Sequence, residues 1–201
     1  MSITDGAIAH GPAATGHVDY ETKQRQWHMA AILFLVSDIV FVVALFFSYL
    51  YLRALNVNHM WMPASVHPPS MSSNVVLSGL VVLSAVFWRI GDIGVRRGNQ
   101  GQLKAGLTIA WLLFAVDAVV QIRQLSEVTF SPGSGGFASS FYALAGYHMF
   151  HLVFGMILGG GILSRAIKGK YSERDFTQVQ SVGYFWYWVA IMAIGMLLLP
   201  K

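Results

Sequence analysis

Two histidines and two aspartates occur in stretches of the sequence that are otherwise apolar. His148 and His151 lie one helical turn apart in "ALAGYHMFHLVFGMILGG", Asp38 lies in "FLVSDIVF", and Asp117 lies in "LLFAVDAVVQ" with Gln121 one turn later. Imidazole and carboxylate groups in such places can bind a metal or haem, relay protons, or hold helices together by hydrogen bonds. At membrane depth each costs roughly 2.5 to 3.5 kcal/mol on insertion scales, so such residues are seldom kept without a use.

The composition around these residues indicates a membrane protein. The chain has 201 residues, of which 55% are hydrophobic and 11% are charged, whereas a soluble domain has about 25% charged residues. Five apolar runs reach the roughly 20 residues that a spanning helix needs; they cover residues 29–52, 74–93, 103–122, 137–163 and 181–199. Because only a helix satisfies its own backbone in hydrocarbon, we predict an all-α polytopic membrane protein with five transmembrane helices in one bundle.

The lysines and arginines predict the orientation of this bundle. Cytoplasmic loops carry an excess of these residues, and ten of the thirteen fall on one side of the predicted membrane. We therefore expect the amino terminus in the cytoplasm and the carboxyl terminus outside. The ten are Lys23, Arg25, Arg89, Arg96, Arg97, Lys104, Arg165, Lys168, Lys170 and Arg174.

The same pattern suggests the domain organisation and excludes one class of partner. Residues 1–26 have no basic region followed by an apolar core, so they do not form a signal peptide and are predicted to be a flexible cytoplasmic tail. Residues 27–201 are predicted to form the transmembrane domain. The net charge of +4 comes from loops beside the membrane, where bases meet anionic lipid headgroups, and this argues against nucleic-acid binding.

Small and polar residues form one stripe on the fourth predicted helix. His148, His151, Gly155 and Gly159 recur at spacings of three, four and four, which places them on one face. Gly155 and Gly159 form the small-xxx-small pattern that favours close helix contacts. We predict helix packing at these two glycines and at Gly146, which precedes the histidines.

A metal site fits these residues poorly. Two histidines at i and i+3 point the same way and cannot hold one haem iron from opposite faces, and no other predicted span contains a histidine. A dinuclear site needs more carboxylates than two aspartates supply. The loop "HMWMPASVH" carries soft ligands that could hold copper(I), although such loops more often anchor the chain through aromatic residues. We predict that this chain binds no metal or other cofactor of its own and has no catalytic residue.

Hydrogen bonding across helix interfaces is the favoured role for the two histidines. The expected partners are a carboxylate or a backbone carbonyl, and such bonds fix geometry more than they add stability. A role in proton relay stays open, because histidine and aspartate chains carry protons in pumps. Asp38 is expected to be protonated near neutral pH unless one of the histidines reaches it.

Two motifs resemble the subunit III family of haem–copper respiratory oxidases, in its short five-helix form. "FLVSDIVFVVALFFSYLYLR" is similar to the family's first-span motif, in which an acidic residue after serine precedes an aromatic run, and "GYHMFHLVFG" is similar to its glycine–histidine–histidine–glycine signature. Gln121 falls where glutamine or glutamate is usual. The sequence departs from the family pattern at Gln124, where a second glutamate is common, and at Tyr187 and Ala190, where a histidine and an aspartate are usual.

The resemblance implies an accessory subunit of cytochrome c oxidase or quinol oxidase in the bacterial plasma membrane. Its partners would be catalytic subunit I, which holds the haems and copper, together with subunit II and bound phospholipid. Asp38 would be the functional carboxylate near the entry side for protons, with His148 and His151 as structural neighbours. Three alternatives stay open: an accessory subunit of a nitric-oxide reductase, a haem b membrane anchor, and a proton-coupled transporter.

Overall fold

Five long helices make up most of the structure. The computed structural model describes residues 20–59 and 61–199. All five helices are long and apolar enough to cross a membrane, and these described residues contain no strand. The all-α fold with five potential spanning helices, predicted from the sequence, is therefore confirmed. The elements in chain order are α1 (Tyr20–Leu55), η1 (Val57–His59), α2 (Met71–Arg96), α3 (Gln100–Glu127), η2 (Pro132–Ser134), α4 (Gly136–Ile167) and α5 (Thr177–Leu198), where η marks a short 3₁₀ turn.

The helices extend beyond the apolar runs that predicted them. Residues 20–26, which we assigned to the tail, instead form the first turns of α1. This stretch contains no glycine or proline and is rich in Glu, Lys, Gln and Arg, which favour helix, so the helix continues where the apolar run ends. Residues 1–19, the rest of the predicted tail, lie outside the described part of the chain. The 36 residues of α1 span about 54 Å at 1.5 Å per residue, well beyond the roughly 30 Å thickness of a hydrocarbon core.

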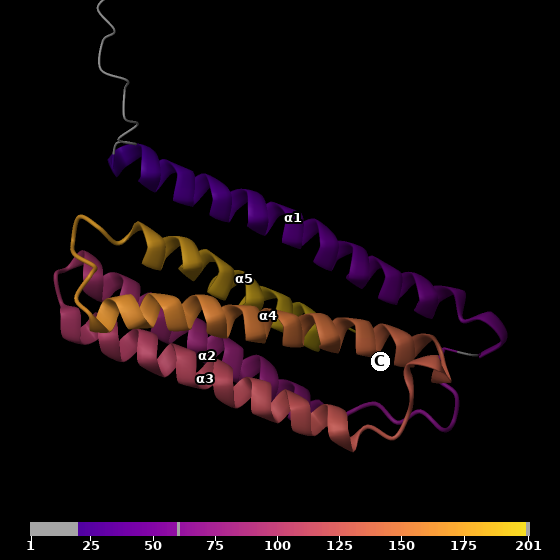
Figure 1. The fold of residues 1–201 in the computed structure, drawn as a ribbon. Coiled ribbons are helices and arrows are strands. Elements are labelled where there is room, and N and C mark those ends of the chain that lie inside the picture. The colour runs from indigo at the N-terminus through magenta and orange to yellow at the C-terminus, as the bar shows by residue number, and fades with distance from the viewer. Residues whose placement is uncertain (1–19, 60, 200–201) are drawn as a thin grey trace, which may run out of the picture.

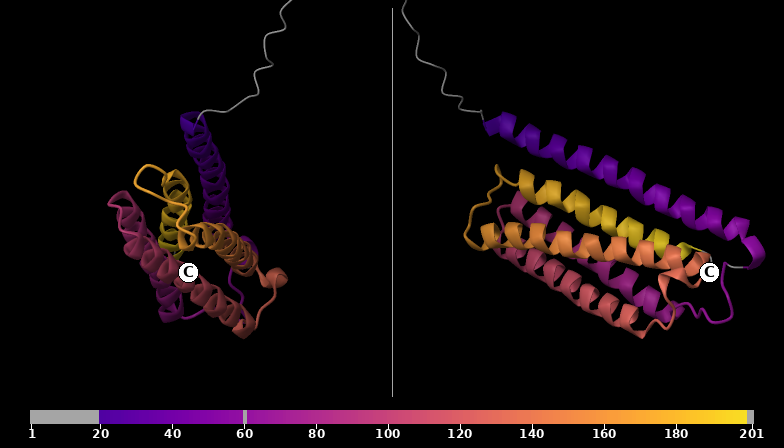
Figure 2. Two further views of the ribbon diagram at one scale, coloured as in Figure 1. Left: turned by 60° about the vertical axis from the view of Figure 1, so that its left-hand side comes forward. Right: turned by 45° about the vertical axis from the view of Figure 1, so that its right-hand side comes forward.

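Helices α2 to α5 pack together, and α1 lies along one side of them (Figure 1). In the described residues α1 contacts α4 and α5 but neither α2 nor α3, and the turned views show the same arrangement (Figure 2). The backbones of α2 and α3 approach closely at Gly91 and Gly106, where a Cβ on Gly106 would lie 2.6 Å from the backbone nitrogen of Gly91. Glycines therefore allow α2 and α3 to pack closely, and these glycines lie outside the stripe predicted on the fourth helix.

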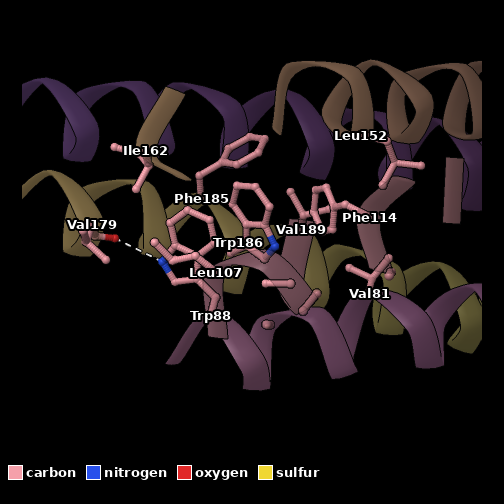
Figure 3. Packing of buried hydrophobic residues seen from close by; sticks show 14 of the residues in the cluster. Val81, Trp88, Leu107, Phe114, Leu152, Ile162, Val179, Phe185, Trp186 and Val189 are labelled. Carbon is pink, nitrogen blue, oxygen red and sulfur yellow. Dashed lines mark hydrogen bonds between the residues drawn. The ribbon is translucent and has the colours of Figure 1, made fainter. Parts of the chain in front are cut away.

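Stacked aromatic rings fill the centre of the bundle (Figure 3). The Trp186 ring lies between Trp88 and Phe114, with ring centroids 4.1 and 4.4 Å away. Trp88 donates a hydrogen bond to the carbonyl of Val179, and Trp186 donates one to the hydroxyl of Ser84. Both indole N–H groups thus have a partner, which buried tryptophans usually require.

The glycines of α4 leave room for these rings. A Cβ on Gly159 would lie 2.5 Å from the Trp186 ring, and a Cβ on Gly155 would lie 2.6 Å from the Phe114 ring. Both glycines therefore lie against aromatic side chains of other helices and not against a helix backbone. A Cβ on Gly146 would meet no atom of another described helix or loop within 4 Å, so the described part of the chain gives this glycine no packing partner.

The two ends of the bundle differ in chemistry. We call the end with connections 56–70 and 128–135 the long-loop end, and the end with connections 97–99 and 168–176 the basic end. At the basic end the buried Asp92 accepts hydrogen bonds from Arg89 and Arg96. In the connection before α5, burial raises the pKa of Tyr171 to about 12, so its hydroxyl stays protonated and donates to Gln178.

Helix α1 is the least buried of the five long helices. In its most apolar stretch 11% of the residues are buried, against 33 to 44% in the other four helices. Its few buried side chains include Asp38, Val42 and Tyr49, so the contacts of α1 with the bundle concentrate around a carboxylate. The opposite face exposes large apolar side chains, among them Leu33, Val36, Val40, Val43 and Phe47.

Candidate functional site

Asp38 joins α1 to the bundle through three hydrogen bonds. Its Oδ1 accepts from the hydroxyl of Tyr147 at 2.5 Å, and its Oδ2 contacts Nε2 of His151 at 2.8 Å and Nε1 of Trp188 at 2.5 Å. Asp38 and His151 are 6% and 0% exposed, so these bonds form away from bulk water. We call Asp38, Tyr147, His151 and Trp188 the Asp38 cluster; it takes one residue from α1, two from α4 and one from α5.

The partners of His151 limit where its protons lie. Its Nδ1 is 2.8 Å from the backbone carbonyl of Tyr147, and because a carbonyl can only accept, Nδ1 must carry a proton. The contact between Nε2 and Asp38 then holds one further proton, either on the imidazole or on the carboxyl. Both arrangements leave the His151–Asp38 pair with no net charge, which suits a buried site.

A second pair lies about one turn of α4 away, toward the long-loop end. Nε2 of His148 is 3.2 Å from Oδ2 of Asp117, and the two residues are 3% and 0% exposed. Unlike Asp38, this pair is incompletely satisfied, because Nδ1 of His148 and Oδ1 of Asp117 are buried without a partner among the described residues. The two histidines of one helix thus pair with aspartates of different helices, α3 and α1.

The structure places the remaining predicted residues around these pairs. Gln121 lies one turn beyond Asp117 on α3, is 3% exposed, and lines a cavity together with His148. Among the predicted helix-packing positions, Gly155 has the rings of Phe114 and Phe185 against it. Since the ring of Phe185 also stacks on His151, Gly155 and the Asp38 cluster share a neighbour.

Two members of the Asp38 cluster were missed in the sequence. We singled out neither Tyr147 nor Trp188, because both belong to the apolar and aromatic residues of their spans. Their polar atoms could have identified them, because a phenol O–H or an indole N–H in the middle of a span needs a hydrogen-bond partner. Trp188 lies between Tyr187 and Ala190, where the sequence departs from the family pattern.

The described part of the chain brings no metal-binding group together. Nowhere in residues 20–59 and 61–199 do three or more His, Cys, Asp or Glu side chains converge as they would around a metal ion. The arrangement can instead hold and exchange protons, since each pair combines a carboxyl group with an imidazole.

With this geometry in place, comparison with known proteins gives the family. Residues 8–199 match the family described as "Cytochrome c oxidase subunit III". The match covers almost the whole chain, including both motifs that form the Asp38–His151 pair. The chain belongs to the cytochrome c oxidase subunit III family.

Individual relatives are distant in sequence. The chain is similar to cytochrome c oxidase subunit 3 of Corynebacterium diphtheriae, with 25% identity over 84% of this chain and 83% of that protein. It is also 25% identical to a protein of Nocardia farcinica named "Probable cytochrome c oxidase subunit 3", over 96% of each chain. The match to the rat subunit 3 has 21% identity and covers 84% of this chain and 66% of that protein, so this chain spans about two thirds of the rat protein.

Proposed function

We propose that this protein is a non-redox accessory subunit III of a haem–copper terminal oxidase in aerobic respiration. It stabilises the catalytic subunit, binds phospholipid, and supports proton uptake and oxygen access. The observation that carries the proposal is the Asp38 cluster, because the acidic residue of one family motif pairs there with the second histidine of the other. Haem and copper belong to the partner, subunit I, with subunit II beside it.

In this proposal Asp38 is the functional carboxylate. Its pair with His151 holds a proton at a buried position on α1, the helix with the largest exposed share. A proton held there lies close to whatever covers α1, which fits a role beside the partner subunit's proton path. His148, Asp117 and Gln121 support the packing on the other side of α4.

The basic end supports the proposed orientation. Arg96, Arg97, Arg165 and Lys168 lie at helix ends or connections there, and the excess of such residues marks the cytoplasmic side. We infer a multi-pass protein of the bacterial plasma membrane whose basic end faces the cytoplasm and contacts anionic phospholipid headgroups.

Purification through a tag on this chain in a mild detergent tests the assignment. We expect a large complex with a haem absorption spectrum, which consumes oxygen with a cytochrome c or quinol donor. The chain separated from that complex should keep neither haem nor copper after washing. Stoichiometric haem on the isolated chain would support a haem b anchor, solute movement by the reconstituted chain alone would support a transporter, and nitric-oxide reduction by the complex would support a nitric-oxide reductase; each result contradicts the proposal.

Deletion of this subunit tests the accessory role separately. The remaining complex should reduce oxygen in its first turnovers and lose activity progressively, because the catalytic subunit has lost a stabilising neighbour. Immediate and complete loss of oxygen reduction, with haem and copper still in place, would contradict an accessory role.

A further inference from the structure

A cavity at the long-loop end is not explained by the Asp38 cluster. It has a volume of about 90 Å³ and is lined by residues of all five helices. A single water needs roughly 10 to 15 Å³ of such cavity volume, so the cavity is large enough for several waters. Its polar lining consists of Tyr49, Asn74, Ser78, Gln121, Gln124 and His148.

Gln121 is the polar side chain that most requires a partner in this cavity. It is 3% exposed, and its amide makes no hydrogen bond to any other described residue. The amide is not sealed by protein atoms either, since it lies on the cavity wall. A buried amide has two donors and an acceptor to satisfy, and in native proteins such groups are satisfied by protein or by ordered water.

Neighbouring side chains keep the same wall polar. Gln124 donates to Ser73 and to Asn74, which tethers α3 to the start of α2. Ser78 donates to the carbonyl of Ala193, so its oxygen can still accept. Donors and acceptors thus follow the cavity from the start of α2 inward to His148.

At its inner end the cavity reaches the Asp117–His148 pair. His148 is part of the cavity wall, and its Nε2 contacts Asp117. Each residue of the pair has one buried polar atom without a partner. A water that enters from the cavity beside His148 would give these atoms the hydrogen-bond partner that the described protein residues do not supply.

We propose that this cavity is an internal hydration site, in which a cluster of ordered waters bound by Gln121, Gln124 and Ser78 joins the Asp117–His148 pair to the long-loop end of the bundle. The site lies about one turn of α4 from the Asp38 cluster, toward the long-loop end, and does not depend on the proposed function. The two carboxylates then differ in their surroundings: Asp38 bonds to Tyr147, His151 and Trp188, whereas the histidine partner of Asp117 lies on the wall of the hydrated cavity.

Cysteine labelling of the intact complex tests this proposal, because the chain contains no cysteine of its own. Gln121→Cys and Ser78→Cys place thiols on the cavity wall. Val119→Cys is the matched control, because this apolar side chain lies on α3 like Gln121, is 58% exposed and does not line the cavity. The cysteine thiolate is the nucleophile that attacks a thiol reagent, and it forms where water reaches the sulfur. A small water-soluble methanethiosulfonate should therefore label the two cavity cysteines roughly tenfold or more faster than the control, as measured by mass spectrometry of the digested chain.

Labelling after unfolding and labelling in sealed vesicles complete the test. Labelling after unfolding in detergent should be complete for all three variants, which shows that each thiol is present and reduced. In sealed vesicles a membrane-impermeant reagent should label the cavity cysteines from the side that holds the long-loop end. If both cavity cysteines in the native complex are as slow as Val119→Cys, or react only after lipid is removed, the cavity is dry or filled by lipid and the proposal is wrong. A chain that purifies without a haem complex would contradict the proposed function and leave this comparison intact.

Discussion

The indole N–H of Trp188 donates a hydrogen bond to the carboxyl of Asp38 at 2.5 Å, across 150 positions of sequence. This bond joins α5 to α1, which otherwise presents mainly apolar side chains to its surroundings. His151 of α4 contacts the same carboxyl oxygen, Oδ2 of Asp38. The two helices that contact α1, α4 and α5, are therefore both bonded to this one atom. Asp38 thus connects α1 to both of the helices that it contacts.

Loss of the Trp188 bond should weaken the attachment of α1. Trp188→Phe keeps an aromatic ring and removes the N–H. A hydrogen bond to a neutral carboxyl group contributes roughly 0.5 to 1.5 kcal/mol, and one to an ionised carboxyl group contributes roughly 1.5 to 3 kcal/mol. We expect a lower midpoint of thermal unfolding for the purified complex. Trp27→Phe, at an exposed position near the start of α1, is the control and should leave the midpoint unchanged. Equal midpoints for both variants would show that the Trp188 bond contributes nothing.

Replacing Asp38 separates proton chemistry from packing. Asp38→Asn keeps the shape and an acceptor oxygen but removes the ionisable group, whereas Asp38→Ala also leaves Tyr147, His151 and Trp188 without their partner. If Asp38 serves proton uptake, the asparagine variant should slow sustained turnover or reduce proton coupling while the subunit stays bound. The alanine variant should in addition loosen the complex, because it leaves buried polar groups unsatisfied.

The control for this pair is Ser48→Ala, because the exposed Ser48 hydroxyl donates to the carbonyl of Ala44 on its own helix. It should change neither turnover nor assembly. Normal turnover, coupling and assembly in both Asp38 variants would remove Asp38 from the functional residues.

A Gly→Ala substitution on α4 should destabilise the protein only where an aromatic ring lies against the glycine. In Gly159→Ala the new methyl group would lie 2.5 Å from the Trp186 ring, and overpacking of this kind costs about 1 to 3 kcal/mol. Gly161→Ala, where no atom lies within 4 Å, should be neutral or slightly stabilising, because alanine favours helix over glycine by roughly 1 kcal/mol. Denaturant titration of the two variants measures the difference, and a neutral Gly159→Ala would show that the ring moves freely.

The buried and the exposed ion pairs at the basic end should contribute differently to the stability of the protein. Asp92 is 2% exposed and bonds both Arg89 and Arg96, so Asp92→Asn should lower stability by roughly 1 to 2 kcal/mol after allowance for the partly exposed arginines. Glu21 and Arg25 form a pair at 4.0 Å on the exposed start of α1, and Glu21→Gln should have no measurable effect. A comparable loss in both variants, measured by thermal unfolding, would contradict this distinction.

The number and type of helices could be predicted from the sequence, but their ends could not. Hydropathy marks the stretch that lies in hydrocarbon, whereas a helix ends where capping or turn residues stop it. Residues 20–26 are polar, so they fell outside the apolar run although they are good helix formers. At the end of α2, Arg97 and Gly98 close the helix a few residues after the predicted limit at residue 93.

The polar residues of the site were found in the sequence, but their pairing was not. The spacing of His148 and His151 predicts that both face the bundle, and both do. Which aspartate each one meets depends on where α1 and α3 lie around α4, and that arrangement is set by packing between distant segments. Trp188 was missed for the same reason, since an indole shows a role for its N–H only when its neighbours are known.

The attachment of α1 through one carboxylate also has a consequence for the order of synthesis. Asp38 emerges from the ribosome 109 residues before Tyr147, 113 before His151 and 150 before Trp188. During that interval the first helix enters the bilayer with a carboxyl group that has none of these partners, at an insertion cost of roughly 2.5 to 3.5 kcal/mol. A nascent chain arrested before α4 should therefore hold its first helix in the membrane less firmly than an Asp38→Leu version of the same chain, and the difference should disappear once α5 has been made.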